Sequence, residues 1–240
     1  MNVQGSRLSA KNIGELALPN FCQRCFWIRM RLGNKVPFRT PPPGIFSSID
    51  AYTKRYIEKL LSSGKIAKMI PDLANASGIF KERIPDLRHD YSNGTVFLTG
   101  VPDAIFLNNN ASYSIVDYKT ARFTEAQRSM LPLYEVQVRA YAAIAKAAGL
   151  KPLNSLLLIY LEPLTGDESI AEDVSNEVLD PSYLKLKLQP FVHTIKQNEF
   201  QVFRLLESAD RIIQLSEPPE PLEGCESCKA MQSLYKLIPR

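Results

Sequence analysis

The sequence lacks a long apolar run, a clustered block of basic residues and an internal repeat. A helix needs about 20 consecutive apolar residues to cross a membrane. The most apolar stretch, residues 156–161, is far shorter and is predicted to be a buried strand. The first residues, 1–12, are polar and do not resemble a secretory signal. We therefore expect a cytoplasmic protein with no membrane partner.

Histidine is scarce, and the charges nearly balance. The two histidines are predicted to be ordinary polar residues, His89 in a loop and His193 on a solvated helix face. With 29 basic and 25 acidic residues, the net charge of +4 permits a nucleic-acid partner without requiring one. A chain of 240 residues, 45% of them hydrophobic, can bury one sizeable core, so we expect a single domain over residues 1–240.

The most informative stretch is predicted to be a β-hairpin. Residues 96–107 and 113–119 are rich in aromatic and β-branched side chains, and the asparagine-rich turn 108–111 separates them. Side chains alternate between the two faces of a strand, so Asp117 and Lys119 share one face. Val116 and Tyr118 share the other.

Three charged side chains are expected to meet on this hairpin, because Asp103 belongs to the first strand and Asp117 and Lys119 to the second. Charged groups on an otherwise apolar strand are costly to bury unless they have partners or a task. The alternative is an exposed hairpin with a surface Asp–Lys pair, since the pattern D-x-K is very common by itself.

The spacing of these residues resembles the PD-(D/E)XK nuclease superfamily. Pro102-Asp103 is followed, after thirteen residues, by Asp117-Tyr118-Lys119. The resemblance implies that Asp103 and Asp117 hold a divalent metal, for which carboxylate oxygens favour Mg²⁺ or Mn²⁺. It also implies that Lys119 assists the attacking water and the developing negative charge.

A second motif follows at the distance typical of the RecB-like branch. A helix is predicted over residues 132–148, with a proline in its first turn and a glycine after its end. Its face carries Tyr134, Gln137 and Tyr141, and Q-x-x-x-Y matches the motif with which RecB-like nucleases are thought to hold DNA. The alternative is a Tyr–Gln surface on a core helix. A buried strand is expected next, at residues 153–161.

The RecB-like resemblance also implies a metal-binding His or Glu on an early helix. Residues 47–64 predict an amphipathic helix, and its carboxylates are Asp50 and Glu58, with no histidine. The expected apolar stripe consists of Ile49, Tyr52, Tyr56, Leu60 and Leu61.

The remaining elements are predicted more coarsely. Ser9 is expected to cap a short helix, and residues 37–45 to form a proline-rich connector. Strands are predicted at 78–85, where Glu82 could face the site, and at 170–179, with a polar loop at 122–130. C-terminal helices are expected over 183–203 and onward to 214.

The four cysteines form two C-x-x-C pairs, Cys22 with Cys25 and Cys225 with Cys228. Two such pairs in an intracellular protein indicate a metal centre, either tetrahedral Zn²⁺ or an iron–sulfur cluster. Reduced cysteines without a metal are the alternative. CRISPR-associated RecB-like exonucleases and AddB nucleases carry a [4Fe–4S] cluster on one N-terminal and three C-terminal cysteines. That similarity favours iron–sulfur here, although this chain offers two and two.

Together the motifs predict an α/β, restriction-endonuclease-like domain, with a mixed central sheet flanked by helices. Residues 1–36 and 215–240 would form the cysteine metal staple, and residues 96–161 the catalytic core. The implied function is metal-dependent hydrolysis of single- or double-stranded DNA in repair, recombination or mobile-element or CRISPR-type processing, with a helicase or similar protein as a conceivable partner. The alternatives are an inactive nucleic-acid-binding module of the same fold and a zinc-stapled protein-interaction domain.

Overall fold

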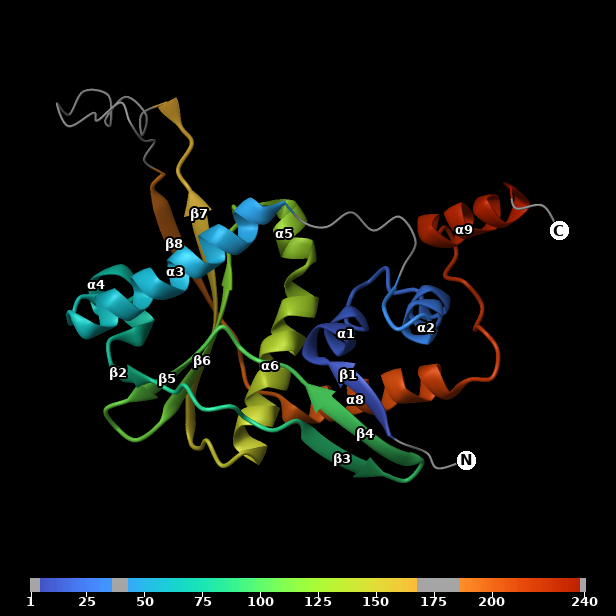
Figure 1. Cartoon of the computed structure of the whole chain (residues 1–240), viewed down its shortest axis with the longest axis horizontal. Coiled ribbons are helices and arrows are strands. Elements are labelled where there is room, and N and C mark those ends of the chain that lie inside the picture. Colours follow the sequence, from blue (N-terminus) through green and yellow to red (C-terminus); the bar gives the residue numbers. More distant parts are fainter. Residues whose placement is uncertain (1–4, 36–42, 168–185, 238–240) are drawn as a thin grey trace.

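The structure is a computed structural model that describes residues 5–35, 43–167 and 186–237. It contains two β-sheets with helices packed between and around them (Figure 1). The larger sheet has the order β2-β5-β6-β7-β8, and only β6 and β7 run parallel. Its strands are β2 (Ala76–Ile79), β5 (Ala104–Asn108), β6 (Tyr113–Lys119), β7 (Leu153–Pro163) and β8 (Leu188–Thr194). This mixed sheet flanked by helices confirms the predicted fold class.

The smaller sheet has the order β1-β4-β3 and lies beside the N-terminal helices (Figure 1). Its strands are β1 (Ser6–Ser9), β4 (Gly94–Thr99) and β3 (Leu87–Tyr91). The helices are α1 (Ala10–Glu15), α2 (Gln23–Arg31), α3 (Gly44–Ser62), α4 (Ile66–Met69), α5 (Glu125–Ser129), α6 (Leu131–Ala147), α8 (Glu199–Gln214) and α9 (Glu226–Leu237), with a 3₁₀ turn at Pro71–Leu73. Among the described residues, none of these helices combines the length and the apolarity needed to span a bilayer.

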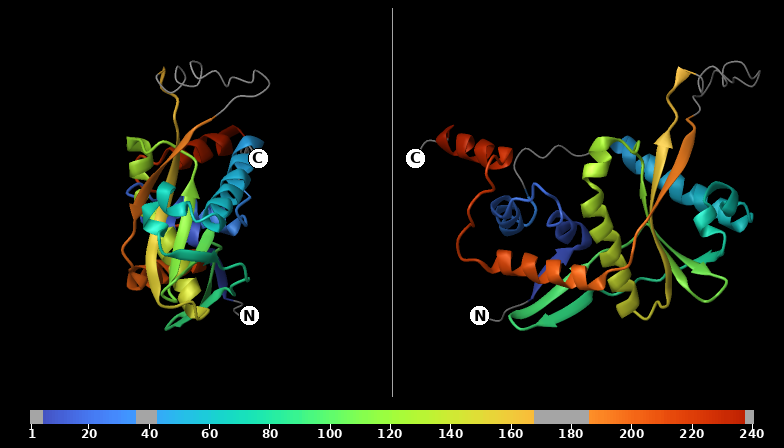
Figure 2. Two further views of the ribbon diagram at one scale, coloured as in Figure 1. Left: turned by 90° about the vertical axis from the view of Figure 1, so that its left-hand side faces the viewer. Right: turned by 180° about the vertical axis from the view of Figure 1, so that it is seen from behind.

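Alternation along β6 and β7 builds two apolar cores, one on each face of the larger sheet. Ile115 and Leu156 face α6 and share a core with the smaller sheet, α1 and α8. Val116 and Leu157, the next residue in each strand, face α3 and α4 and pack against residues such as Ile57. Figure 2, seen from behind, shows α6 and α3 on opposite sides of the sheet. Tyr118 lies in the α3 core, so the predicted assignment of faces along β6 is confirmed.

Several predicted elements are present with small shifts in their ends. Ser9 caps α1 through a capping box with Asn12, in which each side chain bonds the backbone of the other. The predicted helix 132–148 is α6, with Pro132 in its first turn and Gly149, at φ 91°, beyond its end. The predicted strand 153–161 is the first part of β7.

The predicted continuous strand 96–107 is wrong, because the chain passes there from one sheet to the other. β4 ends at Thr99 and β5 begins at Ala104. Gly100 makes the crossing against the Tyr141 ring, where a Cβ would lie 2.7 Å from Cε1. Pro102 has no N–H to donate to a strand ladder. This interruption places Asp103 just before the first residue of β5.

The apolar stripe of the early helix is also corrected. α3 buries Thr53 and Ile57, whereas Tyr52 and Tyr56 are exposed by 64% and 46%. The buried positions recur at i and i+4, one residue later than predicted for the tyrosines. The helix therefore presents two large aromatic side chains to solvent.

Four further predictions need correction. Residues 188–194 form β8 rather than a helix, because Leu188 and Val192 pack against the α3 core while the strand pairs with β7. His89 belongs to β3, and the predicted loop at 122–130 contains α5. The strand predicted at 78–85 is reduced to β2, at Ala76–Ile79. The strand predicted at 170–179 and most of the proline-rich connector, 36–42, lie outside the described residues.

Close packing of α1 on α6 generates a test of this architecture. A Cβ added at Gly14 would lie 2.5 Å from the Leu133 carbonyl oxygen, which belongs to the backbone. We expect Gly14→Ala to lower the free energy of unfolding by about 1–3 kcal/mol through overpacking. The melting temperature, followed by circular dichroism, should fall by several degrees.

Gly44→Ala is the matched control, because a Cβ at Gly44 meets nothing within 4 Å and alanine suits the first turn of α3. If Gly14→Ala melted at the wild-type temperature, the close approach of α1 to α6 would be refuted.

Candidate functional site

The strand register brings the first two predicted residues together. Ala104 of β5 pairs with Val116 of β6, so Asp103, immediately before Ala104, lies beside Asp117. Asp117 is only 3% exposed. The Lys119 ammonium lies 2.6 Å from Asp117 Oδ2, at the end of the same strand. The predicted convergence of the three charges is thus found in the structure.

Both Asp103 carboxylate oxygens have partners. Oδ2 accepts a hydrogen bond from the Tyr118 backbone N–H at 2.8 Å, and Oδ1 lies 2.8 Å from Lys54 Nζ. Lys54 also lies 2.9 Å from Asp50 Oδ2. Desolvation acts against protonation of Lys54, but its hydrogen bonds to Asp103 and Asp50 outweigh this and raise its pKa.

The sequence-based site did not include Lys54. The sequence did offer one indication of it, because Asp50 and Lys54 are four residues apart on the early helix. Residues at this spacing lie on the same helix face. In the described part of the chain, Asp50 is linked to Asp103 through Lys54. Glu58, the other carboxylate considered on this helix, pairs with Lys81 at 2.9 Å instead.

Burial dominates the electrostatics of Asp117. Desolvation raises the pKa of this carboxyl, the nearby charge of Lys119 acts to lower it, and the Asp103 carboxylate raises it further. A buried carboxylate of this kind gains from any cation placed beside it. Lys119 is that cation here, and its ammonium also lies 4.5 Å from the centre of the Tyr134 ring.

Helix α6 carries the two other predicted site residues, Gln137 and Tyr141. Gln137 Nε2 donates a hydrogen bond to Tyr141 Oη at 2.7 Å, and both side chains are buried. Burial, and secondarily the charge of Asp117, raises the pKa of Tyr141. Gln137 Oε1 is buried without a hydrogen-bond partner among the described residues.

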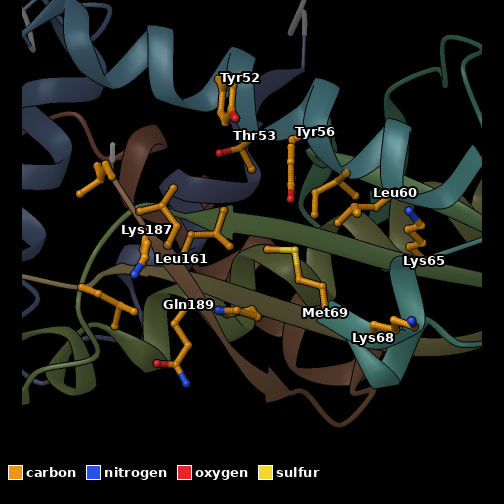
Figure 3. Close-up of a pocket in the computed structure, with 15 residues that line it drawn as sticks. Tyr52, Thr53, Tyr56, Leu60, Lys65, Lys68, Met69, Leu161, Lys187 and Gln189 are labelled. Atoms are coloured by element: carbon orange, nitrogen blue, oxygen red, sulfur yellow. The ribbon is translucent and has the colours of Figure 1, made fainter. Parts of the chain in front are cut away.

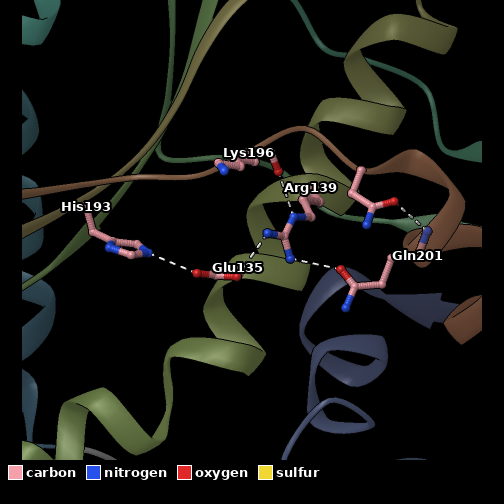
Figure 4. A network of polar contacts seen from close by, with 6 residues as sticks. Glu135, Arg139, His193, Lys196 and Gln201 are labelled. Carbon is pink, nitrogen blue, oxygen red and sulfur yellow. Dashed lines mark hydrogen bonds and ion pairs between the residues drawn. The ribbon is translucent and has the colours of Figure 1, made fainter.

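A polar network fixes α6 against the C-terminal half of the chain (Figure 4). Glu135 lies 3.0 Å from His193 Nε2 and 2.9 Å from Arg139, which also donates to Gln201 and to the Lys196 carbonyl at 2.8 Å. The predicted solvated face at His193 is therefore wrong, because the histidine connects β8 to α6. The network holds the helix that carries Gln137.

The other polar candidates lie apart from these contacts. His89 Nε2 is 3.0 Å from Glu207 Oε1, and its ring stacks on Phe203. Glu82 is exposed at a bend after β2.

The four cysteines meet as predicted, although the two pairs are about 200 residues apart in sequence. Cys25 Sγ lies 3.3 Å from Cys228 Sγ and 3.5 Å from Cys225 Sγ, and Cys22 Sγ lies 3.6 Å from Cys228 Sγ. All four sulfur atoms lie within 4.8 Å of one another. The cluster therefore has the number and kind of ligands for a metal ion.

The thiols differ in their ease of ionisation. Burial would raise the pKa of Cys22, but hydrogen bonds from the backbone amides of Leu222 and Cys25 outweigh it and lower this pKa to about 6. Burial raises the pKa of Cys228 to about 11, and that of Cys25 as well. Metal ligation requires thiolates, so a cation at the cluster would offset the cost of ionising all four.

Helix α2 holds the C-terminal segment on which the second pair depends. Arg24 Nε donates to the Pro219 carbonyl at 2.7 Å, and Arg31 and Trp27 donate to the Leu215 carbonyl at 2.7 and 3.0 Å. These side chains thus position the approach to α9.

A comparison with protein families finds a match that covers the residues of this site. The model of the family described as the PD-(D/E)XK nuclease superfamily matches residues 46–233, which include Asp103, Asp117, Lys119, Gln137 and Tyr141. The chain therefore belongs to this superfamily. No curated protein gives a significant match. A solved structure titled "Crystal structure of SSO0001" is 12% identical with a TM-score of 0.42, covering 98% of this chain and 85% of that one.

The cysteine cluster generates the second prediction. Cys25→Ser removes a sulfur that contacts two others, so we expect the variant to hold less metal than the wild type and to melt at a lower temperature. Elemental analysis for zinc and iron, beside thermal unfolding, checks both effects.

Ser227→Ala is the control, because Ser227 lies between the two C-terminal cysteines and is exposed. Equal metal content in wild type and Cys25→Ser would contradict a four-cysteine centre.

Proposed function

We propose that this protein is a metal-dependent deoxyribonuclease that hydrolyses phosphodiester bonds. The observation that carries the proposal is the meeting of Asp103, Asp117 and Lys119 at the junction of β5 and β6, beside Gln137 and Tyr141 of α6. Membership of the nuclease superfamily supports it. The core shared by the smaller sheet, α1, α6 and α8 supports a single domain.

Asp103 and Asp117 fit a hard divalent cation. Each presents a carboxylate, and Asp103, immediately before β5, lies beside Asp117 of β6. Carboxylate oxygens are the ligands that Mg²⁺ and Mn²⁺ prefer. When bound, such an ion would polarise the scissile phosphate and make a bound water more acidic. Desolvation raises the pKa of Asp117, so a cation bound beside this carboxylate would favour its charged form.

Lys119 and Lys54 place two ammonium groups at the same carboxylates. Lys119 lies against Asp117 and Lys54 against Asp103. We assign to Lys119 the stabilisation of negative charge that develops on the phosphate, since preorganised cations act most strongly where water is excluded. Lys54 orients Asp103 through its ion pair.

Gln137 and Tyr141 position the DNA strand in this proposal. The hydrogen bond from Gln137 Nε2 fixes the position of the Tyr141 hydroxyl oxygen. Gln137 Oε1 remains available to accept a hydrogen bond from substrate or water.

For the cysteine centre we propose a structural zinc ion. Zinc binds thiolate at about 2.3 Å, which separates neighbouring sulfurs of a tetrahedron by about 3.8 Å. The closest Sγ separations here, 3.3–3.6 Å, are near that value. A [4Fe–4S] cluster spreads its cysteine sulfurs farther apart, and the similarity to CRISPR-associated and AddB nucleases keeps it as the second candidate.

Cleavage of labelled single- and double-stranded DNA with Mg²⁺ or Mn²⁺ tests the function. Lys119→Ala and Asp117→Asn should each lower the rate by about 10²-fold or more, because one loses the charge-stabilising ammonium and the other a metal ligand. The proteins should be purified without oxygen so that the cysteine centre stays filled. Asp72→Asn, an exposed carboxylate on the 3₁₀ turn, is the matched control.

Full activity of Lys119→Ala would refute the assigned site. DNA binding without cleavage by folded wild-type protein would identify the inactive binding module. Stoichiometric zinc without any nucleic-acid binding would identify the interaction domain. Roles in repair, recombination or CRISPR-type processing, and a helicase partner, rest on the RecB-like resemblance alone.

A further inference from the structure

A groove of about 820 Å³ opens between α3, α4 and the β7–β8 pair. Figure 3 shows Tyr52 and Tyr56 descending into it from α3, with Lys65, Lys68 and Met69 along its far end. It lies on the α3 face of the larger sheet, opposite the face that packs on α6. The proposed nuclease site does not account for this groove.

The two tyrosines form an exposed aromatic platform. Their ring centres are 5.9 Å apart and their planes differ by 17°, so the rings stack one helical turn apart. Exposures of 64% and 46% leave much of both side chains in solvent. Exposed aromatic groups lining a groove mark an interaction site.

The charge around the groove favours a polyanion. Residues 44–69 carry five basic and two acidic side chains, a net charge of +3. The net charge of the whole chain is +4, so most of the excess positive charge lies in this segment. The two acids are already paired, Asp50 with Lys54 and Glu58 with Lys81. Lys65 and Lys68 are exposed at the groove, and neither forms an ion pair with another described residue.

We propose that this groove binds a single strand of nucleic acid, with bases stacked on Tyr52 and Tyr56 and phosphates beside Lys65 and Lys68. Aromatic platforms in basic grooves bind single strands in this way. A duplex offers no free base faces, because each base is covered by its neighbours.

The groove adjoins the nuclease site through α3. Thr53 lines the groove, and the next residue, Lys54, contacts Asp103. A strand cleaved at Asp103 and Asp117 can therefore continue along the same helix. The proposal rests on the proposed function and adds a substrate form, a single-stranded segment next to the scissile bond.

Equilibrium binding without divalent metal tests the groove separately from catalysis. Anisotropy of a fluorescein-labelled oligothymidylate, in EDTA, should show about tenfold weaker binding for each tyrosine removed in Tyr52→Ala and Tyr56→Ala. Lys65→Ala/Lys68→Ala should reduce the slope of log affinity against log salt by roughly 0.7 per lysine. Affinity for a blunt duplex should change much less in the tyrosine variants.

The controls match size and charge elsewhere on the surface. Phe200→Ala/Tyr235→Ala removes two exposed aromatic side chains from α8 and α9, and Lys11→Ala/Lys151→Ala removes two exposed lysines. Tyr52→Phe/Tyr56→Phe keeps the stacked rings and should keep wild-type affinity.

Two results would overturn the proposal that this groove binds a single strand of nucleic acid. The first is equal oligonucleotide affinity in groove and control variants. The second is self-association of wild-type protein in light scattering that Tyr52→Ala/Tyr56→Ala abolishes, because the groove would then join two copies of the chain. Metal-dependent cleavage by wild type, lost in Lys119→Ala, would leave the nuclease proposal standing in either case.

Discussion

The site depends on the buried carboxylate of Asp117, which lies two residues before the end of β6. Burial alone disfavours its charge, so the molecule must surround it with compensating groups. Lys119 follows on the same strand face, and α6 carries the hydrogen-bonded pair Gln137 and Tyr141. The Glu135–His193 contact then secures α6 to β8. These contacts around the larger sheet thus compensate or secure the surroundings of one buried negative charge.

Local sequence patterns predicted those parts of the site that depend on strand and helix periodicity. Alternation placed Asp117 and Lys119 on one face, and the helical repeat placed Gln137 with Tyr141; both arrangements are present in the structure. Their catalytic roles remain predictions. The meeting of the cysteines followed from ligand chemistry, since two C-x-x-C pairs complete one tetrahedral set.

The parts that could not be predicted depend on contacts between distant segments. Residues 96–107 carry strong strand formers on both sides of Gly100 and Pro102, and packing of Gly100 against Tyr141 helps to divide them between two sheets. Lys54 resembles any exposed helical lysine until Asp103 is placed beside it. Likewise, the strand at Leu188–Thr194 is decided by pairing with β7, which its own sequence does not reveal.

The distance in sequence between the two cysteine pairs fixes the order in which the cluster can form during translation. Cys25 and Cys225 are separated by 200 positions, so the ribosome exposes the first pair long before the second exists. During that interval the two thiols of the first pair lack their C-terminal sulfur partners and are open to oxidants and to competing ions. A four-cysteine site can therefore be completed only after the C-terminal segment has emerged and reached α2.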